Sequence, residues 1–259
     1  MNIDLTGKRA MVCGSTAGIG LACAHELAAL GASLTLVARN ADKLAAVLET
    51  LPAGDHTHVT ADFSDPTAVK NAANEALERA GTHHILINNT GGPPGGRAID
   101  ADPDEFLKAF NAHLVNNQHL AKALVPGMRE AKYGRIINII STSVKAPIPG
   151  LGVSNTIRGA VASWAKTLAS ELGPDGITVN NVLPGFTDTD RLGELFGAKA
   201  KKLGTTQDQV LAQAIESIPL RRLAEPAETA YAVAFLASPS AAYISGINLP
   251  VDGGRLQTL

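Results

Sequence analysis

The chain has 259 residues, of which 45% are hydrophobic and 18% are charged, a composition typical of a globular protein with a large aliphatic core. Its 22 Lys and Arg residues against 24 Asp and Glu residues give a formal net charge of -2. The sequence thus lacks the excess of basic residues that would predict a nucleic acid or an acidic membrane as partner. We expect the substrate to be a small molecule.

The sequence lacks the features of an exported or membrane protein. Charges and glycines come too early in the opening segment MNIDLTGKRAMVCG for the apolar core of a signal peptide, and no apolar run is long enough to span a bilayer. We therefore expect a cytoplasmic location. The two cysteines, Cys13 and Cys23, have neither metal-ligand nor redox spacing, so we expect reduced core residues and no metal site.

Short β-branched apolar runs alternate with longer segments of helical periodicity along the whole chain. This pattern predicts an α/β fold of successive β-α units, with a doubly wound parallel sheet of about seven strands flanked by helices. No linker, charge block or repeat divides the sequence, so we expect a single domain over residues 1–259. The predicted strands are 9–13, 33–38, 58–61, 85–88, 135–140, 178–183 and 248–251.

The segments between the strands carry helix signals at their ends. Gly31 follows the first helix, Pro52 follows the second, and Asp65 precedes the third as a cap. Residues 188–217 are helical in tendency but lie between the last two strands. Because ligands of open parallel sheets bind beyond the carboxyl ends of the strands, we expect this insertion to be a flap over the substrate. The predicted helices are 21–30, 41–51, 66–79, 104–132, 152–172 and 226–237.

A glycine-rich segment joins the first predicted strand to the first predicted helix. In this context the glycines predict a dinucleotide site, since they permit a tight turn and a close approach of pyrophosphate to the backbone and the helix N-terminus. A turn without a ligand is the alternative. The candidate cofactor-binding residues in this segment are Gly14, Ser15, Thr16, Gly18, Ile19 and Gly20.

Arg39 follows the second strand, at the place where a site that prefers NAD usually carries an acid for the ribose hydroxyls. A carboxylate there repels a 2′-phosphate, whereas a guanidinium binds it in a bidentate manner. The sequence therefore favours NADP(H) as cofactor, with NAD(H) as the alternative. If Arg39 is merely a solvated loop residue, this preference is lost.

Further landmarks occur in the expected order and end with the segment IPLRRLAEPAETAYAVAFLAS and YISGINLPVDGG. With them the chain resembles the short-chain dehydrogenase/reductase family, in particular its β-ketoacyl-carrier-protein-reductase-like branch, over nearly its whole length. The resemblance implies a Rossmann-like fold and an oxidoreductase acting on a carbonyl or hydroxyl group of a small molecule, with a 3-oxoacyl thioester as a candidate. The landmarks are GSTAGIG at 14–20, Ala61-Asp62, Asn88-Asn89-Thr90-Gly91, Ser141, and Pro184-Gly185 with Thr189.

The same resemblance assigns further residues to the cofactor. Asp62 would contact the adenine, and Asn89 and Gly91 would line the cofactor channel, although Asn89 also suits a role in bracing the sheet. The nicotinamide carboxamide would lie against residues that follow the sixth strand. The remaining cofactor-binding candidates are Phe63, Arg158, Pro184, Thr187 and Thr189.

The expected catalytic centre departs from the family pattern. The resemblance implies a serine that orients the substrate carbonyl, a tyrosine thirteen residues later as general acid, and a lysine four residues further on. Counting from Ser141 gives Ser154 and Arg158, and an asparagine expected in the preceding long helix aligns with His113. Of the four catalytic positions, Ser141 alone keeps the residue type of the family.

These replacements matter because the alkoxide left by hydride transfer must take up a proton. A phenol near pKa 10 suits that task, whereas a serine hydroxyl is a far weaker acid and reaches less far. Arg158 can still hydrogen-bond the ribose but is not a proton donor. His113, whose ordinary pKa is about 6.5, is the nearby group expected to titrate near neutrality and to pass a proton through Ser154 or water. A histidine that merely braces the centre is the alternative.

Three functions stay open at this point. The first, which we favour, is an NADP(H)-dependent carbonyl reductase or alcohol dehydrogenase with a modified proton relay through Ser141, Ser154, Arg158 and His113. The second is a cofactor-binding protein without redox catalysis, acting as a sensor or partner subunit. The third is a non-redox reaction, such as an elimination or isomerisation, in the same fold. The resemblance also implies a homo-oligomer, most simply a homotetramer, paired through the two long helices at 104–132 and 152–172.

Overall fold

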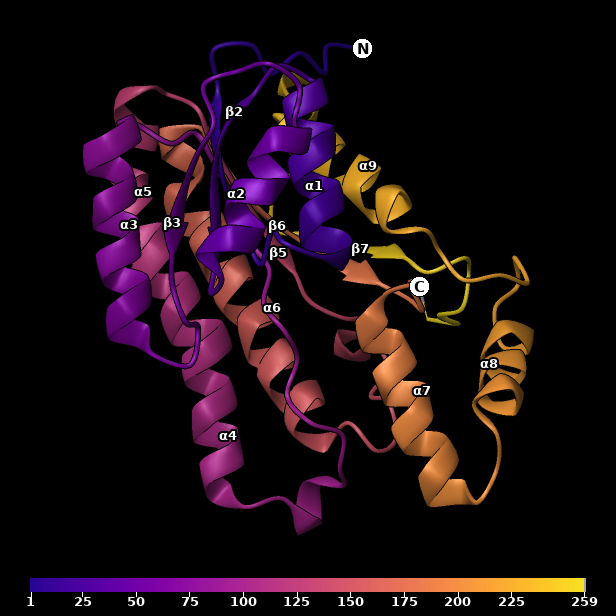
Figure 1. Ribbon diagram of the computed structural model, residues 1–259. Helices are drawn as coiled ribbons and strands as arrows, with labels where there is room; N and C mark the ends of the chain where they lie inside the picture. The colour runs from indigo at the N-terminus through magenta and orange to yellow at the C-terminus, as the bar shows by residue number, and fades with distance from the viewer. Residues whose placement is uncertain (259) are drawn as a thin grey trace.

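The computed structural model describes residues 1–258, which form a seven-stranded, all-parallel sheet with helices on both faces (Figure 1). The strand order is β3-β2-β1-β4-β5-β6-β7, so the predicted doubly wound α/β fold is confirmed. Because both faces are covered, the central strands are buried along nearly their whole length and show no alternation between buried and exposed residues. The strands are β1 (Arg9–Cys13), β2 (Ser33–Ala38), β3 (Thr57–Thr60), β4 (Ile85–Asn88), β5 (Gly134–Ile139), β6 (Ile177–Pro184) and β7 (Asn248–Val251).

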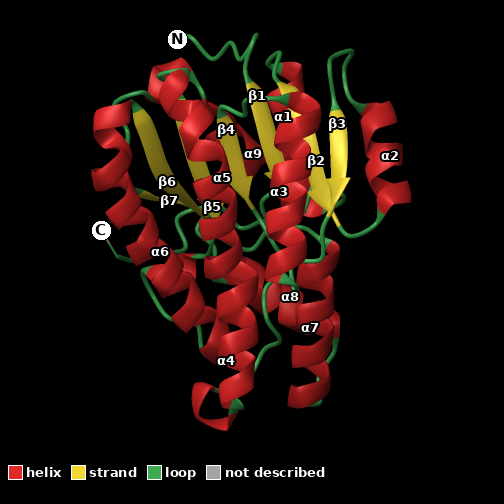
Figure 2. Ribbon diagram, turned by 90° about the vertical axis from the view of Figure 1, so that its left-hand side faces the viewer, coloured by secondary structure: helices red, strands yellow, loops and turns green. Residues whose placement is uncertain are grey.

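Three helices pack on each face of the sheet. α1 (Gly18–Ala29), α2 (Ala41–Thr50) and α9 (Pro226–Ala237) bury their apolar residues in one core cluster. α3 (Pro66–Ala80), α5 (Asn116–Glu130) and α6 (Gly152–Leu172) bury theirs in a second cluster and lie in front of the sheet in Figure 2. Both cysteines are buried and free. None of the helices formed by the described residues has the length and hydropathy needed to cross a bilayer.

Three further helices extend past the sheet, at its lower side in Figure 1. They are α4 (Pro103–Phe110), α7 (Asp190–Leu203) and α8 (Gln207–Glu216). The last two occupy the segment predicted as a flap. Short 3-10 turns complete the described chain, at Ala98–Asp100, Thr142–Val144, Gly173–Asp175 and Pro239–Ala241.

The long helix predicted at 104–132 forms as a continuous helical stretch over residues 103–130, but one of its turns is irregular. A π-helical turn, Asn111–Val115, separates α4 from α5. The wider turn frees a backbone carbonyl, and the Asn116 side chain donates to that of Ala112 at 3.2 Å and to that of Phe63 at 2.7 Å. Such turns are concentrated at functional sites, and His113 lies in the middle of this one. Hydrophobic periodicity does not reveal a single inserted residue.

Smaller differences from the predicted boundaries also have physical causes. α1 begins at Gly18 and not at residue 21, so the second half of the glycine segment is already helical. β3 is displaced by one residue, to Thr57–Thr60, because it pairs in register with β2 from Thr35 onward.

A row of four asparagines crosses the carboxyl half of the sheet. Asn88, Asn138, Asn181 and Asn248 occupy paired positions on β4 to β7. Each amide nitrogen donates to the next amide oxygen at 2.8, 2.9 and 2.8 Å. Because a buried amide without a partner costs free energy, this chain of hydrogen bonds fixes the register of β4, β5, β6 and β7.

We predict that Asn138→Ala lowers the free energy of unfolding by about 2–4 kcal/mol, because it leaves a donor on Asn88 and an acceptor on Asn181 buried and unpaired. Urea unfolding monitored by circular dichroism measures this loss. The control is Asn71→Ala, at an exposed position of α3, where we expect a change of no more than about 0.5 kcal/mol. Equal effects of the two substitutions would show that the row contributes nothing.

Candidate functional site

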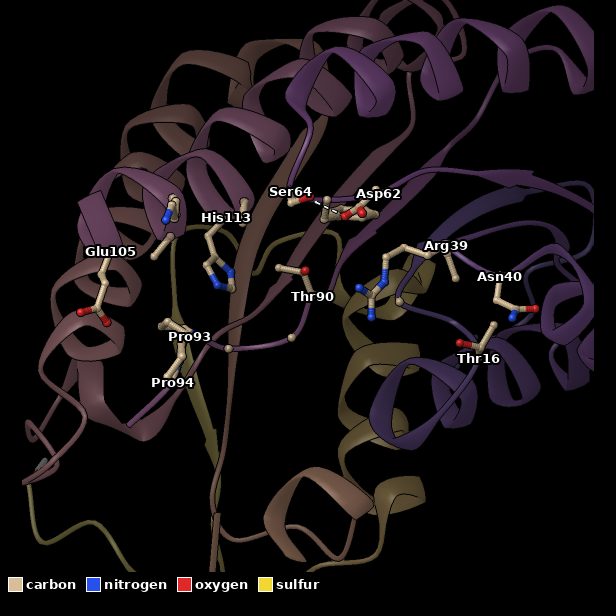
Figure 3. Close-up of a pocket in the computed structure, with 18 of the residues that line it drawn as sticks. Thr16, Arg39, Asn40, Asp62, Ser64, Thr90, Pro93, Pro94, Glu105 and His113 are labelled. Atoms are coloured by element: carbon tan, nitrogen blue, oxygen red, sulfur yellow. Dashed lines mark hydrogen bonds between the residues drawn. The ribbon is translucent and has the colours of Figure 1, made fainter. Parts of the chain in front are cut away.

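A cavity of about 1020 Å³ opens at the carboxyl ends of β1, β2 and β4 (Figure 3). The strand order reverses between β1 and β4, and the crevice at such a reversal is where open parallel sheets bind ligands. Its walls come from the glycine segment, the loop after β2, the loop after β4, and the helical stretch from α4 to His113. The lining residues are Gly14, Thr16, Ala38, Arg39, Asn40, Lys43, Asp62, Phe63, Ser64, Thr90, Gly91, Gly92, Pro93, Pro94, Glu105, Lys108, Ala109, Ala112 and His113.

The glycine segment is shaped by close backbone contacts. Gly14 and Gly18 have φ angles of +59° and +53°, a conformation that favours glycine. A Cβ atom on Gly20 would lie 2.1 Å from the carbonyl oxygen of Gly14. Asn89 donates from its amide nitrogen to the carbonyl oxygens of Cys13 and Gly14, at 3.2 and 3.3 Å. Asn89 therefore braces this turn from the neighbouring strand end.

The N-terminus of α1 is open to an anion. Its N-cap residue, Ala17, offers no side-chain hydrogen bond, and its first turn has no acidic residue. The first N–H groups of a helix lack intrahelical partners and carry partial positive charge. Ser15 precedes them with a buried hydroxyl that has no hydrogen-bond partner among the described residues. This arrangement fits the pyrophosphate of a dinucleotide.

One wall of the cavity, formed by the loop after β2 and the start of α2, is cationic. Arg39 is exposed and points into the cavity in Figure 3, and Lys43 lines the same wall one helical turn later. The Asn40 side chain accepts from the Lys43 amide at 2.9 Å and so begins α2 at this point. Asp62 lies beside them, and hydrogen bonds from Ser64, with a smaller effect of Arg39, lower the pKa of its carboxyl group. Two cations and one carboxylate thus share this wall.

Ser141 and Ser154, two of the predicted catalytic residues, are not among the residues that line the cavity. Ser141 follows β5, and its hydroxyl oxygen accepts from the Ser143 amide at 3.1 Å, so the Ser141 O–H remains available as a donor. Ser154 is partly buried in the first turn of α6. Arg158 follows one helical turn later on the same helix.

Arg158 is the most unusual group at the site. Its side chain is 8% exposed, and it donates to the carbonyl oxygens of Ile139 at 2.9 Å and Thr90 at 3.5 Å. Burial lowers its pKa to about 10, so the guanidinium stays charged at neutral pH. Within residues 1–258, no carboxylate lies at ion-pair distance from it.

The expectation that His113 titrates near neutrality is wrong. Its side chain is 2% exposed, and burial, reinforced by the charge of Arg158, lowers its pKa to about 2. The imidazole is therefore neutral at physiological pH and cannot release a proton as an imidazolium. Figure 3 shows the ring directed into the cavity between Thr90 and Pro93.

The segment predicted as a flap contacts both glycine-rich loops of the site. Thr189 caps α7, and its methyl group would lie 3.1 Å from a Cβ atom on Gly18. Arg191 donates to the carbonyl oxygens of Gly92 and Pro93 at 3.3 and 3.1 Å. The start of α7 is therefore attached to the loop after β4.

Comparison with known proteins places this geometry in a family. A sequence profile described as Enoyl-(Acyl carrier protein) reductase matches residues 14–255. The chain is 35% identical to the 3-oxoacyl-[acyl-carrier-protein] reductase FabG of Pseudomonas aeruginosa, over 97% of this chain and 98% of that protein. It is 34% identical to the short-chain reductase protein NovJ of Streptomyces niveus, over 95% and 93%. This chain belongs to the short-chain dehydrogenase/reductase family.

Solved structures of this family agree with the fold. L-Sorbose reductase from Gluconobacter frateurii, in complex with NADPH and L-sorbose, superposes with a TM-score of 0.92 at 31% identity, over 100% of both chains. YwfH, an NADPH-dependent reductase of bacilysin biosynthesis, superposes with a TM-score of 0.92 at 29% identity, over 97% of this chain and 99% of that chain.

The sequence-predicted residues fall into two groups at this site. Lining the cavity are Gly14, Thr16, Arg39, Asp62, Phe63, Gly91 and His113. The other predicted residues are not among those that line it: Ser15, Gly18, Ile19, Gly20, Asn89, Ser141, Ser154, Arg158, Pro184, Thr187 and Thr189. The sequence analysis missed two residues of the site. Lys43 could have been found from its position one helical turn after Arg39. For Arg191 the sequence gives no signal. The roles assigned to all these residues stay predictions.

The low pKa values of two buried histidines predict how stability depends on pH. Burial lowers the pKa of His113 to about 2 and that of His83 to about 4, against about 6.5 in an unfolded chain. Below pH 6.5 the unfolded chain therefore binds protons that the folded protein does not. The free energy of unfolding should be unaffected by these groups above about pH 7 and fall by about 1.4 kcal/mol per pH unit for each histidine between pH 6 and pH 4.5.

Urea unfolding at fixed ionic strength over this pH range, with His113→Asn as the variant, measures the contribution of one group. We expect the variant to lose less stability per pH unit than the wild type, by about 1 kcal/mol. His83→Asn is the matched variant at the opposite end of the sheet. If His113→Asn leaves the slope unchanged, His113 is protonated in the folded protein and our assignment of its charge is incorrect.

Proposed function

We propose that this member of the short-chain dehydrogenase/reductase family is an NADP(H)-dependent reductase of a small-molecule carbonyl group, with a 3-oxoacyl thioester among the candidate substrates. The observation that carries the proposal is the continuous cavity from the cationic wall at Arg39 to His113, with the open N-terminus of α1 between them. The names of FabG and of L-sorbose reductase support the reaction class, since each is a reductase.

The charges on the cavity wall support NADP(H) over NAD(H). Arg39 and Lys43, at the N-terminal end of α2, offer two cations to a 2′-phosphate. Asp62 remains ionised beside them to contact the adenine. A guanidinium binds phosphate through two parallel hydrogen bonds, which an ammonium does not do. NADPH, when bound, supplies the hydride with its two electrons.

The residues around the substrate then have defined tasks. Hydride addition to the carbonyl carbon moves the C=O electron pair onto oxygen, and the oxygen takes one proton, so that a ketone, NADPH and a proton give an alcohol and NADP+. Ser141 donates its free O–H to the carbonyl oxygen and orients it. Ser154 and Arg158 stand where the family resemblance places the tyrosine and the lysine. The neutral His113 can relay a hydrogen bond, and water is the source of the proton.

The helices around the site support a homo-oligomer, most simply a homotetramer. Leu107 and Phe110 of α4 and the neighbouring Ile99 expose 62%, 38% and 80% of their surfaces, and a second copy would cover these apolar groups. The cytoplasmic location expected from the sequence stays a prediction.

Incubation with NADPH and a panel of ketones and 3-oxoacyl thioesters tests the proposal. Oxidation of NADPH with formation of the alcohol supports it. Binding of NADPH without oxidation by any compound would favour the sensor or partner subunit. Conversion of a substrate at constant NADPH would favour the non-redox enzyme.

We predict that Arg39→Ala removes a preference for NADPH over NADH of about tenfold or more in the dissociation constants, since one charge-assisted contact contributes roughly 1.5 kcal/mol. Fluorescence titration with both cofactors measures the ratio. Arg79→Ala is the control, because Arg79 is an exposed arginine of α3 that pairs with Glu75 and does not line the cavity. Equal affinities of the wild type for the two cofactors would refute the preference.

We predict that Ser154→Tyr with Arg158→Lys lowers turnover of the native substrate. The new ring would fill space that now holds substrate or water, because three of the four expected catalytic positions differ together from the family pattern. If the site were an ordinary reductase that lacks one acid, the double variant would instead gain about 10²–10⁴-fold. Steady-state rates of NADPH oxidation distinguish the two outcomes.

A further inference from the structure

The charge of Arg158 is not neutralised by the protein. A guanidinium has five N–H donors, and Arg158 uses Nη1 and Nη2 on two backbone carbonyl oxygens. A buried cation without an anionic partner is strongly unfavourable, and proteins normally pair it or neutralise it. Among the described residues, Arg135 is also buried without a carboxylate partner, but its guanidinium lies over the ring of Tyr133 and donates to the carbonyl oxygen of Gly134, whereas no aromatic ring lies against Arg158. Arg158 is therefore prepared to receive an anion.

The guanidinium of Arg158 lies behind the cavity wall, close to Gly92. A Cβ atom on Gly92 would have Nη2 of Arg158 as its nearest neighbour, at 3.8 Å, and Gly92 itself lines the cavity. Gly91 has no atom within 4 Å of the position that a Cβ atom would take. Gly91 and Gly92 themselves thus place no side chain between the cavity and Arg158.

His113 faces the same part of the cavity with both ring nitrogens free. Its side chain is almost fully buried, yet no described residue forms a hydrogen bond with it, and the ring points into the cavity in Figure 3. A neutral imidazole has one N–H donor for a ligand oxygen. Arg158 is near enough for its charge to act on the ring.

The acids around this part of the cavity do not compete for Arg158. Glu105, which lines the wall on α4, accepts from the Asp102 amide at 3.1 Å in the capping box of that helix. Asp62 is at the cofactor wall, where hydrogen bonds from Ser64 hold its carboxylate. Lys108 also lines the cavity, so its positive charge offsets the negative charge of Glu105.

We propose that Arg158 and His113 form a subsite for a carboxylate of the substrate, so that the compound reduced here is an oxo acid. This inference rests on the proposed carbonyl reduction and specifies its substrate class. The cofactor does not supply this anion, because its phosphates are accounted for by the N-terminus of α1 and by Arg39, and ribose hydroxyls are neutral. With the carboxylate bound to Arg158, Ser141 is left for the carbonyl oxygen of the same molecule.

The test compares 2-oxo and 3-oxo acids with their methyl esters as substrates for NADPH oxidation by the intact protein. A charge-assisted contact of the carboxylate should give the acids a kcat/KM at least about tenfold above that of the esters. Calorimetric titration of malonate into the protein saturated with NADP+ is the second measurement, since malonate is a carboxylate that cannot be reduced. We expect saturable binding of malonate to this complex.

Two substitutions locate the effect. Arg158→Met keeps a long side chain without charge, and we expect it to abolish malonate binding and the preference for acids. Arg191→Met is the matched control, because Arg191 contacts carbonyl oxygens of the same loop but has Glu194 as its anionic partner. We expect Arg191→Met to retain the preference for acids. If Arg158→Met does not fold, the comparison of acids with esters on the wild type still decides the matter.

Each outcome bears on a different claim. Reduction of acids and esters with equal kcat/KM would overturn the carboxylate subsite and leave the proposed reductase intact. Malonate binding without reduction of any compound would support the subsite and refute the reductase. Absence of both would refute both. Loss of the acid preference in Arg191→Met to the same extent as in Arg158→Met would assign the effect to the loop and overturn the role of Arg158.

Discussion

The polar centre of this protein depends on one buried guanidinium that has no carboxylate partner. Arg158 lies on α6, and its hydrogen bonds to Thr90 and Ile139 connect that helix to the ends of β4 and β5. The same charge acts on His113 and, together with burial, keeps its imidazole neutral. A lysine has a compact ammonium that cannot span two carbonyl oxygens in this planar way. An arginine at this position can therefore hold both strand ends at once.

The rest of the fold holds this charge in place. The asparagine row from Asn88 to Asn248 links four neighbouring strands, and Asn89 braces the glycine segment from the end of β4. Arg191 connects the start of α7 to the loop after β4 through the carbonyl oxygens of Gly92 and Pro93. Side-chain hydrogen bonds to backbone oxygens thus hold both the glycine segment after β1 and the loop after β4. They reduce the conformational freedom of these two segments.

The sequence predicted what local pattern determines. Alternating apolar runs located all seven strands to within a few residues, and the glycines at 14–20 together with Arg39 located a cavity of the right shape and charge. It did not predict the neutral state of His113, because that state depends on burial and on a cation 45 positions along the chain, from residue 113 to residue 158. The π-helical turn and the contacts of Arg191 also depend on segments that meet only in the folded chain.

The measurement that tests the central claim most directly is the free energy of unfolding of Arg158→Met without ligands, compared with the wild type by urea denaturation at pH 7. Methionine removes the cost of an unpaired buried charge but also removes the donor to the carbonyl oxygens of Ile139 and Thr90. These two effects should nearly cancel, so we expect the free energy of unfolding to change by no more than about 1 kcal/mol. A loss of about 3 kcal/mol or more would contradict the account, because it would show that Arg158 mainly fastens the strand ends and that its charge is already compensated.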